Sequence, residues 1–273
     1  MTKSDTRMPA VAGQFYPADA NKLREQISSF TKGQKEQVDA IACVLPHAGY
    51  MYSGAVAGKT VANVKLKDRI ILLGPNHTGY GVPFSIMTQG IWQTPLGKLK
   101  IDSEFAESLV KRSGILEKDA EAHLGEHCLE VELPFLQYFK EVFEFVPIVI
   151  ASQALINLKK LGEEIASLII ETGAKSETLI IASSDMTHYE QQTDAETKDK
   201  AAIEAILELD EEKLAKRVTG MNISMCGYAP VVSAIVAARI LGAKKATLVK
   251  YQTSADTTGD TESVVGYAGV IIQ

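Results

Sequence analysis

The sequence predicts a single-domain α/β fold, in which helices flank a central mixed sheet that is largely parallel. Short apolar runs alternate with helix-like segments along the chain, as is typical of sheets whose strands are joined by helical crossovers. The 273 residues are enough for one large core. No internal repeat and no linker rich in Pro, Gly and Ser divides them. We therefore expect one domain over residues 1–273.

The first half of the chain supports this alternation. We expect strands at 41–45, 69–73, 84–87 and around Leu99, and helices at 55–64 and 102–113. Gly74-Pro75 ends the second strand, and 94–97 is turn material. Asp102 is the expected N-cap of the second helix, which Gly114 closes.

The second half continues the pattern and makes the sheet mixed. Strands are expected at 143–150 and 178–182, and helices at 155–171 and 228–241. Between these two helices we expect one that begins at Thr193 or Asp194 and ends at about 209, and a short one that Asp210 caps. The chain closes with strands at 246–253 and 263–272. Because a polar loop at 256–262 joins these two strands, we expect them to be antiparallel.

Composition excludes several classes of protein. Lys and Arg number 28 and Asp and Glu number 34, a net charge of −6, so a nucleic-acid-binding role is not expected. No uncharged run is apolar and long enough to span a bilayer, and residues 1–9 lack the apolar stretch of a signal peptide. Three cysteines do not make a disulfide framework, which predicts a cytoplasmic protein. Cys43 and Cys128 are predicted to be core residues.

Two histidines follow strand-like runs directly. The run at 41–45 leads into Pro46-His47-Ala48-Gly49-Tyr50, and the run at 69–73 leads into Gly74-Pro75-Asn76-His77. In open α/β sheets, ligands bind at the carboxyl ends of the strands. Either histidine alone is more often a hydrogen-bonding residue than a metal ligand. Two in matching positions favour a metal site formed by His47 and His77.

Cys226 precedes the apolar segment at 228–241. A free cysteine is usually a small buried hydrophobe. At a helix N-terminus, however, the dipole and free N–H groups lower the thiol pKa. We therefore expect Cys226 to be a metal ligand or a nucleophile.

A third strand-like run, 178–182, leads into Asp185 and His188. Three residues apart, they could face the same side of a helical turn, with Asp185 supporting His188 as an acid or base. The alternative is a helix cap beside an incidental surface histidine.

The sequence His123-Leu124-Gly125-Glu126-His127 matches the H-x-x-E-H pattern of inverted zinc proteases. That pattern needs a helix to aim both histidines at one metal, and Gly125 weakens such a helix. A protease site is therefore not expected. Glu126 and His127 are instead predicted to line the main pocket. Tyr50 and Tyr52 are predicted to do so because they lie close to His47 in sequence.

The ordered set of motifs resembles the Memo family across nearly the whole chain. The matching segments run from Arg7-x-Pro9-Ala10-Val11-Ala12-Gly13-x-Phe15-Tyr16-Pro17 through Pro46-His47-Ala48-Gly49-Tyr50, Gly74-Pro75-Asn76-His77, Thr94-Pro95-Leu96-Gly97, Glu126-His127-x-Leu129-Glu130 and Ser184-Asp185-x-Thr187-His188-Tyr189 to Cys226-Gly227, Gly259-Asp260 and Val264-Val265-Gly266-Tyr267-Ala268.

This family is similar in fold to class III extradiol ring-cleaving dioxygenases, which hold non-haem iron(II) with two His and one carboxylate. The resemblance implies that His47 and His77 take the two His positions, that Cys226 replaces the carboxylate and that His188 is the acid/base residue. A thiolate is softer than a carboxylate, so the dioxygenase activity does not carry over. The resemblance implies iron(II) or copper, with zinc less expected, and prokaryotic members are associated with the AmmeMemoRadiSam gene neighbourhood.

Three functional hypotheses follow. The first is a redox-active, metal-dependent oxidoreductase acting on a small molecule or peptide. The second is a non-catalytic module that binds a peptide or an anionic group on the same scaffold, since an animal Memo protein is described as an adaptor for phosphotyrosine peptides. The third and weakest is a hydrolase with Cys226 as nucleophile and His188 as base.

Overall fold

A twelve-stranded sheet forms the centre of the molecule in the computed structural model, which describes residues 6–31 and 36–273. Its middle consists of four parallel neighbours: β8 (Glu144–Ile150), β3 (Arg69–Pro75), β9 (Thr178–Ser183) and β2 (Ala42–Leu45). All four are almost entirely buried and rich in Ile, Leu and Val, as expected of strands covered on both faces. The predicted mixed, largely parallel sheet is confirmed.

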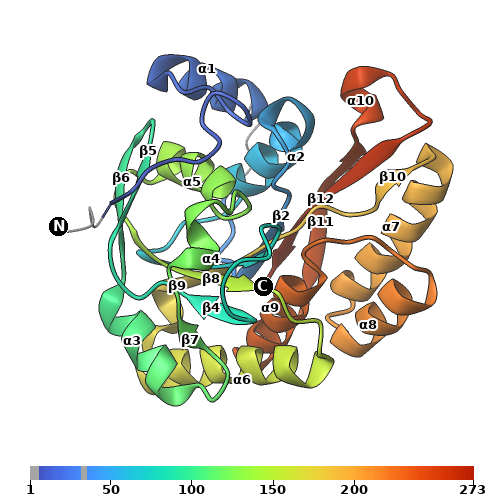
Figure 1. The fold of residues 1–273 in the computed structure, drawn as a ribbon. Helices are drawn as coiled ribbons and strands as arrows, with labels where there is room; N and C mark the ends of the chain where they lie inside the picture. Colours follow the sequence, from blue (N-terminus) through green and yellow to red (C-terminus); the bar gives the residue numbers. More distant parts are fainter. Residues whose placement is uncertain (1–5, 32–35) are drawn as a thin grey trace.

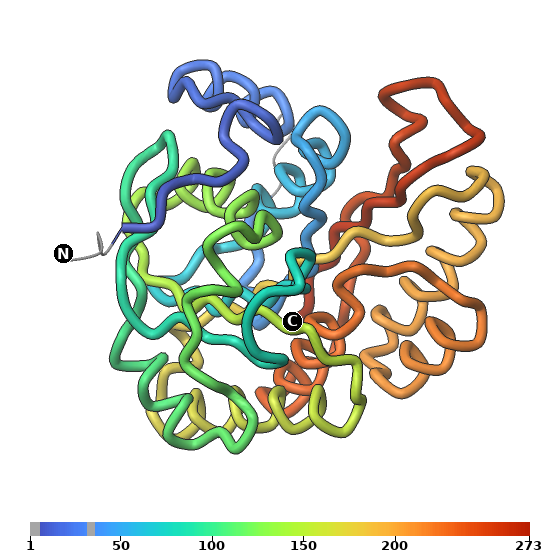
Figure 2. The backbone as a smooth tube through the Cα atoms, in the orientation of Figure 1, coloured from blue at the N-terminus to red at the C-terminus, as the bar shows by residue number. Residues whose placement is uncertain are grey.

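Strands in both directions extend this parallel centre, antiparallel at β2 and parallel at β8 through β6 (Gly97–Ile101). On one side, β12 (Val264–Ile272) pairs with β2, with β11 (Ala246–Thr253) and with β10 (His188–Glu190). On the other side lie β6, β5 (Ile91–Thr94) and β1 (Thr6–Arg7), with β4 (Phe84–Ile86) and β7 (Glu117–Lys118) off the main path. Figure 2 shows β1, at the blue end of the chain, beside the β5–β6 hairpin, and the last strand running through the centre.

The helices form layers around the sheet (Figure 1). One group consists of α1 (Ala20–Phe30), α2 (Tyr50–Ala62) and α5 (Leu133–Phe139), and another of α3 (Ser103–Arg112), α6 (Leu155–Glu171) and α9 (Tyr228–Ile240). Helices α7 (Gln192–Leu207) and α8 (Glu211–Gly220) continue the layer of α9 along β12, and two one-turn helices, α4 (Glu121–Leu124) and α10 (Ala255–Thr258), lie in loops. Of these contacts, α9 against β2, β3 and β9 matters most for the site.

Most of the expected elements are confirmed. Asp102 and Asp210 cap α3 and α8 through their side chains, and α6 has the predicted bounds. Helix α2 begins at Tyr50 rather than 55, and α7 begins at Gln192 rather than at Thr193 or Asp194. Helices α1 and α5 were not expected from the sequence pattern.

Candidate metal centre

The three predicted motifs meet at one edge of the sheet. Strand β9 lies between β3 and β2 and is parallel to both, so all three strands end on the same side. His47 follows β2, His77 follows β3, and Asp185 and His188 follow β9. This neighbourhood gives the structural reason why three separate sequence motifs contribute to one site.

Cys226 reaches the same place from the start of α9. The close approach depends on Gly227, because a side chain there would collide with the Ser183 carbonyl and the Ser184 side chain. The Gly227 N–H donates to Ser184 Oγ at 3.1 Å, and the Asp185 N–H donates to Cys226 Sγ at 3.3 Å. The thiol is thus fixed against the end of β9.

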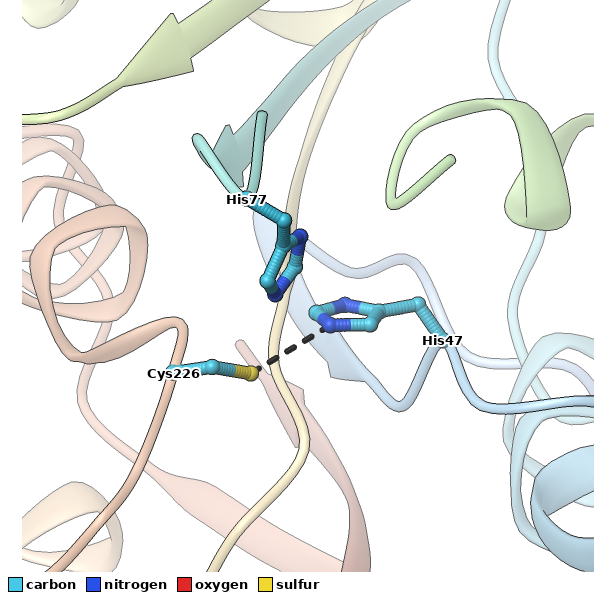
Figure 3. Close-up of side chains that lie close together, drawn as sticks. All are labelled: His47, His77 and Cys226. Carbon is cyan, nitrogen blue, oxygen red and sulfur yellow. Dashed lines mark hydrogen bonds between the residues drawn. The ribbon is translucent and has the colours of Figure 1, made fainter. Parts of the chain in front are cut away.

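The side chains of His47, His77 and Cys226 point toward one another (Figure 3). His47 Nε2 lies 3.3 Å from Cys226 Sγ, and one ligand atom from each of the three residues lies within 4.8 Å of the others. Two nitrogens and one sulfur at such separations can surround one metal ion without rearrangement of the backbone.

A carboxylate fixes His77 from behind. Glu126 Oε1 accepts from His77 Nδ1 at 2.8 Å and from the N–H groups of His127 and Cys128, and Glu126 Oε2 accepts from the His77 N–H at 2.5 Å. Burial opposes ionisation of Glu126, but the hydrogen bonds and charge of His77 hold its pKa well below the usual range. When His77 is neutral, the hydrogen bond to Glu126 keeps its proton on Nδ1, and Nε2 presents a lone pair to the site.

A hydroxyl and a second carboxyl group fix His47. Ser183 Oγ lies 2.8 Å from His47 Nδ1, 2.8 Å from Glu132 Oε1 and 2.9 Å from the Cys128 carbonyl. A serine oxygen donates one hydrogen bond and accepts two, so all three contacts are made when His47 Nδ1 and Glu132 are both protonated. Burial raises the pKa of Glu132 well above its usual range, in agreement with this arrangement. Burial and the neighbouring imidazoles of His127 and His77 lower the pKa of His47, so its Nε2 also presents a lone pair.

Asp185 supports His47 rather than His188. Its Oδ1 accepts from the His47 N–H at 2.9 Å, whereas His188 lies on β10 with Nδ1 2.9 Å from the Ser224 carbonyl. The helical turn expected over these two residues is wrong, because β10 pairs with β12 instead. Burial raises the pKa of Asp185 to about 6, although the charge of His188 opposes this.

The thiol of Cys226 is not activated by its helix. Burial and the charge of Asp185 raise its pKa, and the N–H groups of Asp185 and Gly227 offset only part of this. The expectation that the helix N-terminus lowers this pKa is therefore wrong in the protein without a bound cation. The predicted Cys226–His188 dyad is also not formed, since the imidazole beside Sγ is that of His47.

Comparison with known proteins agrees with the motifs. The family model described as Memo-like protein matches residues 7–271. This chain belongs to the Memo family. A MEMO1 family protein of Methanopyrus kandleri is 43% identical over 98% of this chain and 99% of its own, and one of Methanothermobacter thermautotrophicus is 42% identical over 96% and 98%. The crystal structure of the Escherichia coli protein JW3007 shares the fold, with a TM-score of 0.56 and 14% identity over 85% of this chain and 99% of that one.

In this Memo-family protein two of the three candidate ligands, His47 and His77, line a cavity of about 630 Å³, and the Cys226 thiol lies behind them, beside His47 Nε2. Aromatic side chains form much of its wall. Two of the four predicted pocket residues, Tyr52 and His127, are among them, together with Phe15, Tyr189 and Tyr267. Two other predictions about the pocket are wrong. Tyr50 stacks on Phe135 in the core and donates to the Val131 carbonyl, and Glu126 is buried behind His77.

Phe15 reaches the pocket because the N-terminal segment of the Memo fold is clamped. Buried Glu130 accepts hydrogen bonds from Arg7, from the Ala10 and Val11 N–H groups and from the Tyr16 hydroxyl. This clamp holds the Phe15 ring 4.8 Å from that of His127.

The H-x-x-E-H match does not form a protease site in this family member. Helix α4 ends at Leu124, with Gly125 as its C-cap. His123 is buried edge-on against Trp92. The described residues contain two groups of possible metal ligands, one of His47, His77 and Cys226 and one of His77, Glu126 and His127, and His123 belongs to neither. No helix in the described ranges is long and apolar enough to cross a lipid bilayer.

Four residues at or behind the site had no assigned role in the sequence analysis. Phe15 and Tyr267 fall inside Memo motifs, and that was their available signal. Ser183 and Glu132 gave none, because a serine ending a strand and a glutamate before an apolar helix are ordinary features. The Tyr50 prediction rested on closeness in sequence to His47, which does not give the direction of a side chain.

Proposed function

We propose that this protein is a metal-dependent oxidoreductase that holds iron(II) or copper with His47, His77 and Cys226. The supporting observation is the convergence of the three side chains, with Nδ1 of both histidines occupied by oxygen partners and Nε2 of both facing the thiol. Metal-binding histidines usually have their second nitrogen fixed in this way. Zinc is the less expected ion for a role in redox chemistry, because it has no accessible redox change.

The residues fit such an ion chemically. The buried Cys226 thiol lies next to the carboxyl group of Asp185, and the pKa of each group is raised. A bound cation would therefore strongly stabilise the thiolate form of Cys226. Neutral His47 leaves its lone pair available. Three protein ligands beside a cavity leave room for a further ligand. When bound, iron or copper supplies one-electron redox chemistry to that ligand.

The protein groups have separate tasks in this proposal. Glu126 and Ser183 orient the two imidazoles, and Asp185 holds the His47 loop through its N–H. His188 directs Nδ1 to the Ser224 carbonyl, so its Nε2 is available to accept a proton from a ligand in the cavity. Phe15 and Tyr52 exclude water from one wall of the cavity.

Elemental analysis of protein purified without oxygen or an affinity tag tests the proposal. Wild type, His47→Ala, Cys226→Ser and the control Cys43→Ala are compared, because Cys43 is a buried cysteine on β2 outside the site. We expect near-stoichiometric iron or copper in wild type and Cys43→Ala, and loss of that metal from the two site variants. Oxygen uptake by the loaded protein then measures redox activity.

Two results would contradict the proposal. Cys226→Ser with full metal content and affinity would remove Cys226 from the ligand set. Wild type with no metal after anaerobic reconstitution would favour the non-catalytic binding module, which uses the same cavity.

A further inference from the structure

Tyr267 is a buried tyrosine whose hydroxyl has no hydrogen-bond partner among the described residues. Its side chain is only 2% exposed, and what is exposed faces the cavity of the candidate metal centre. Tyr16, Tyr50 and Tyr251 instead donate to Glu130, the Val131 carbonyl and Asp199. Buried tyrosine hydroxyls normally find a partner, because an unpaired one loses its hydration without compensation. The Tyr267 hydroxyl faces the cavity without a protein partner, so it is free to bind a group that enters the cavity.

The position of Tyr267 is rigid. It lies in β12 opposite Gln252 of β11, and the preceding residue, Gly266, exchanges backbone hydrogen bonds with Met186 and Thr187. These bonds connect Tyr267 to the loop that carries Asp185 and His188. A ligand held by this hydroxyl would therefore be placed relative to the site by two strands rather than by a mobile loop.

The hydroxyl keeps its proton at neutral pH. Burial, with the nearby charge of Asp185 and the phenols of Tyr52 and Tyr189, raises the pKa of Tyr267. A phenol that stays protonated donates a hydrogen bond, so it suits a ligand oxygen with a lone pair.

The remaining walls restrict the ligand further. The described lining residues include Asp185 and Asp260 but no Lys or Arg, the side chains that usually neutralise a phosphate dianion. Ala48 and Gly49, at the start of α2, also line the cavity, and the N-terminus of a helix favours a modest negative charge. The rings of Phe15, Tyr52 and His127 provide flat walls.

We propose that Tyr267 binds the ligand of this cavity by donating a hydrogen bond to a ligand oxygen, and that the ligand is planar and carries a carboxylate-like group of at most one negative charge. The inference rests on the proposed function in one respect: the ligand sits in the cavity of the candidate metal centre. Tyr267 itself contacts the ligand and is not a metal ligand.

Calorimetric titration with benzoate and with phenyl phosphate tests the inference on wild type, Tyr267→Phe and the matched control Tyr50→Phe. We expect benzoate to bind wild type more tightly than phenyl phosphate. Tyr267→Phe should weaken benzoate binding about tenfold or more, as expected for loss of a hydrogen bond to a charged group. Its thermal midpoint and metal content should stay unchanged, because the deleted hydroxyl has no partner in the protein. Tyr50→Phe should keep wild-type benzoate affinity and lower the thermal midpoint by roughly 2 °C, since it loses a buried hydrogen bond.

Equal benzoate affinity in wild type and Tyr267→Phe would overturn the role of Tyr267. Tighter binding of phenyl phosphate, or no binding of benzoate to wild type, would overturn the ligand class. Metal content is measured on the same samples, so wild type without metal would refute the metal proposal, whereas the ratio of benzoate affinities would still decide the role of Tyr267.

Discussion

His47 and His77 present the same ligand atom, Nε2, but their surroundings are opposite. We call His47 with Ser183 and Glu132 the His47 arm of the site, and His77 with Glu126 the His77 arm. The His47 side chain is 2% exposed and backed by the Ser183 hydroxyl and by Glu132, whose pKa burial raises. The His77 side chain is 32% exposed and backed directly by ionised Glu126. The carboxyl group behind His47 therefore favours its protonated form, and the carboxyl group behind His77 favours its ionised form.

The difference shows that burial alone does not decide whether a carboxyl group ionises. Glu126 and Glu132 are both almost completely buried, at 1% and 0%. Glu126 accepts from three backbone N–H groups and one imidazole, whereas Glu132 has the Ser183 contact and one oxygen without a partner among the described residues. Donors replace the water that a buried charge has lost, so their number decides the outcome.

Glu126→Gln gives the sharpest test of this comparison. The amide would direct an NH₂ group at N–H donors and remove the charge that those donors stabilise. We expect the free energy of unfolding to fall by about 2–3 kcal/mol, measured by urea denaturation of metal-free protein at pH 7. Metal affinity should fall by roughly 10- to 100-fold. The control is Glu121→Gln, which changes an exposed glutamate. An equal loss of stability and metal affinity in this control would show that the effect is not specific to Glu126.

Ser183→Ala removes the hydroxyl that connects His47 to Glu132. His47 Nδ1, Glu132 and the Cys128 carbonyl would each lose a partner. We expect a loss of about 1–2 kcal/mol in unfolding free energy and roughly tenfold weaker metal binding. Ser233→Ala removes a buried serine hydrogen bond to the Leu158 carbonyl. It should lose similar stability and keep its metal affinity, and a similar loss of metal in both variants would argue against a specific role of Ser183.

The pH dependence of stability should have opposite signs for the two carboxyl groups. The lowered pKa of Glu126 gives stability that is present above its unfolded pKa of about 4.5 and lost as the pH falls below it. The raised pKa of Glu132 makes the folded state bind the extra proton, so stability is lost as the pH rises above about 4.5.

Urea titrations of metal-free wild type and both Glu→Gln variants between pH 3 and 8 measure these slopes. The stability advantage of wild type over Glu126→Gln should shrink below pH 4.5, and that over Glu132→Gln should shrink above it. If the two stability differences changed with pH in the same direction, the pKa values of Glu126 and Glu132 would not be shifted in opposite directions.

Glu132→Gln should have the smallest effect. It replaces a neutral acid by a neutral amide of the same shape, so we expect a change within about 1 kcal/mol in unfolding free energy at about pH 4, where the glutamate of the unfolded chain is also mostly protonated. Thermal or urea unfolding measures it directly. A loss as large as that of Glu126→Gln would mean that Glu132 is ionised and would abolish the contrast between the arms.

The sequence predicted the location of the site well because strand ends are local features. Apolar runs followed by His47 and His77 indicated two strands whose ends meet, and the structure brings both together with Cys226. The relation of Asp185 to His188 was mispredicted, because β10 pairs with β12, a strand contributed by the last residues of the chain. The direction of Tyr50, into the core, was likewise set by its packing against Phe135.

By itself, the sequence determined the alternation of strands and helices, the family and the residues at the strand ends. Periodicity and motifs depend only on residues that are close together in the sequence. Only the tertiary structure decided which partner each side chain has and which groups carry charge. The pKa values of Glu126, Glu132 and Cys226 are shifted by burial and by groups that distant segments contribute. Desolvation and hydrogen bonding depend on what surrounds a group in space, and that is fixed only when the chain has folded.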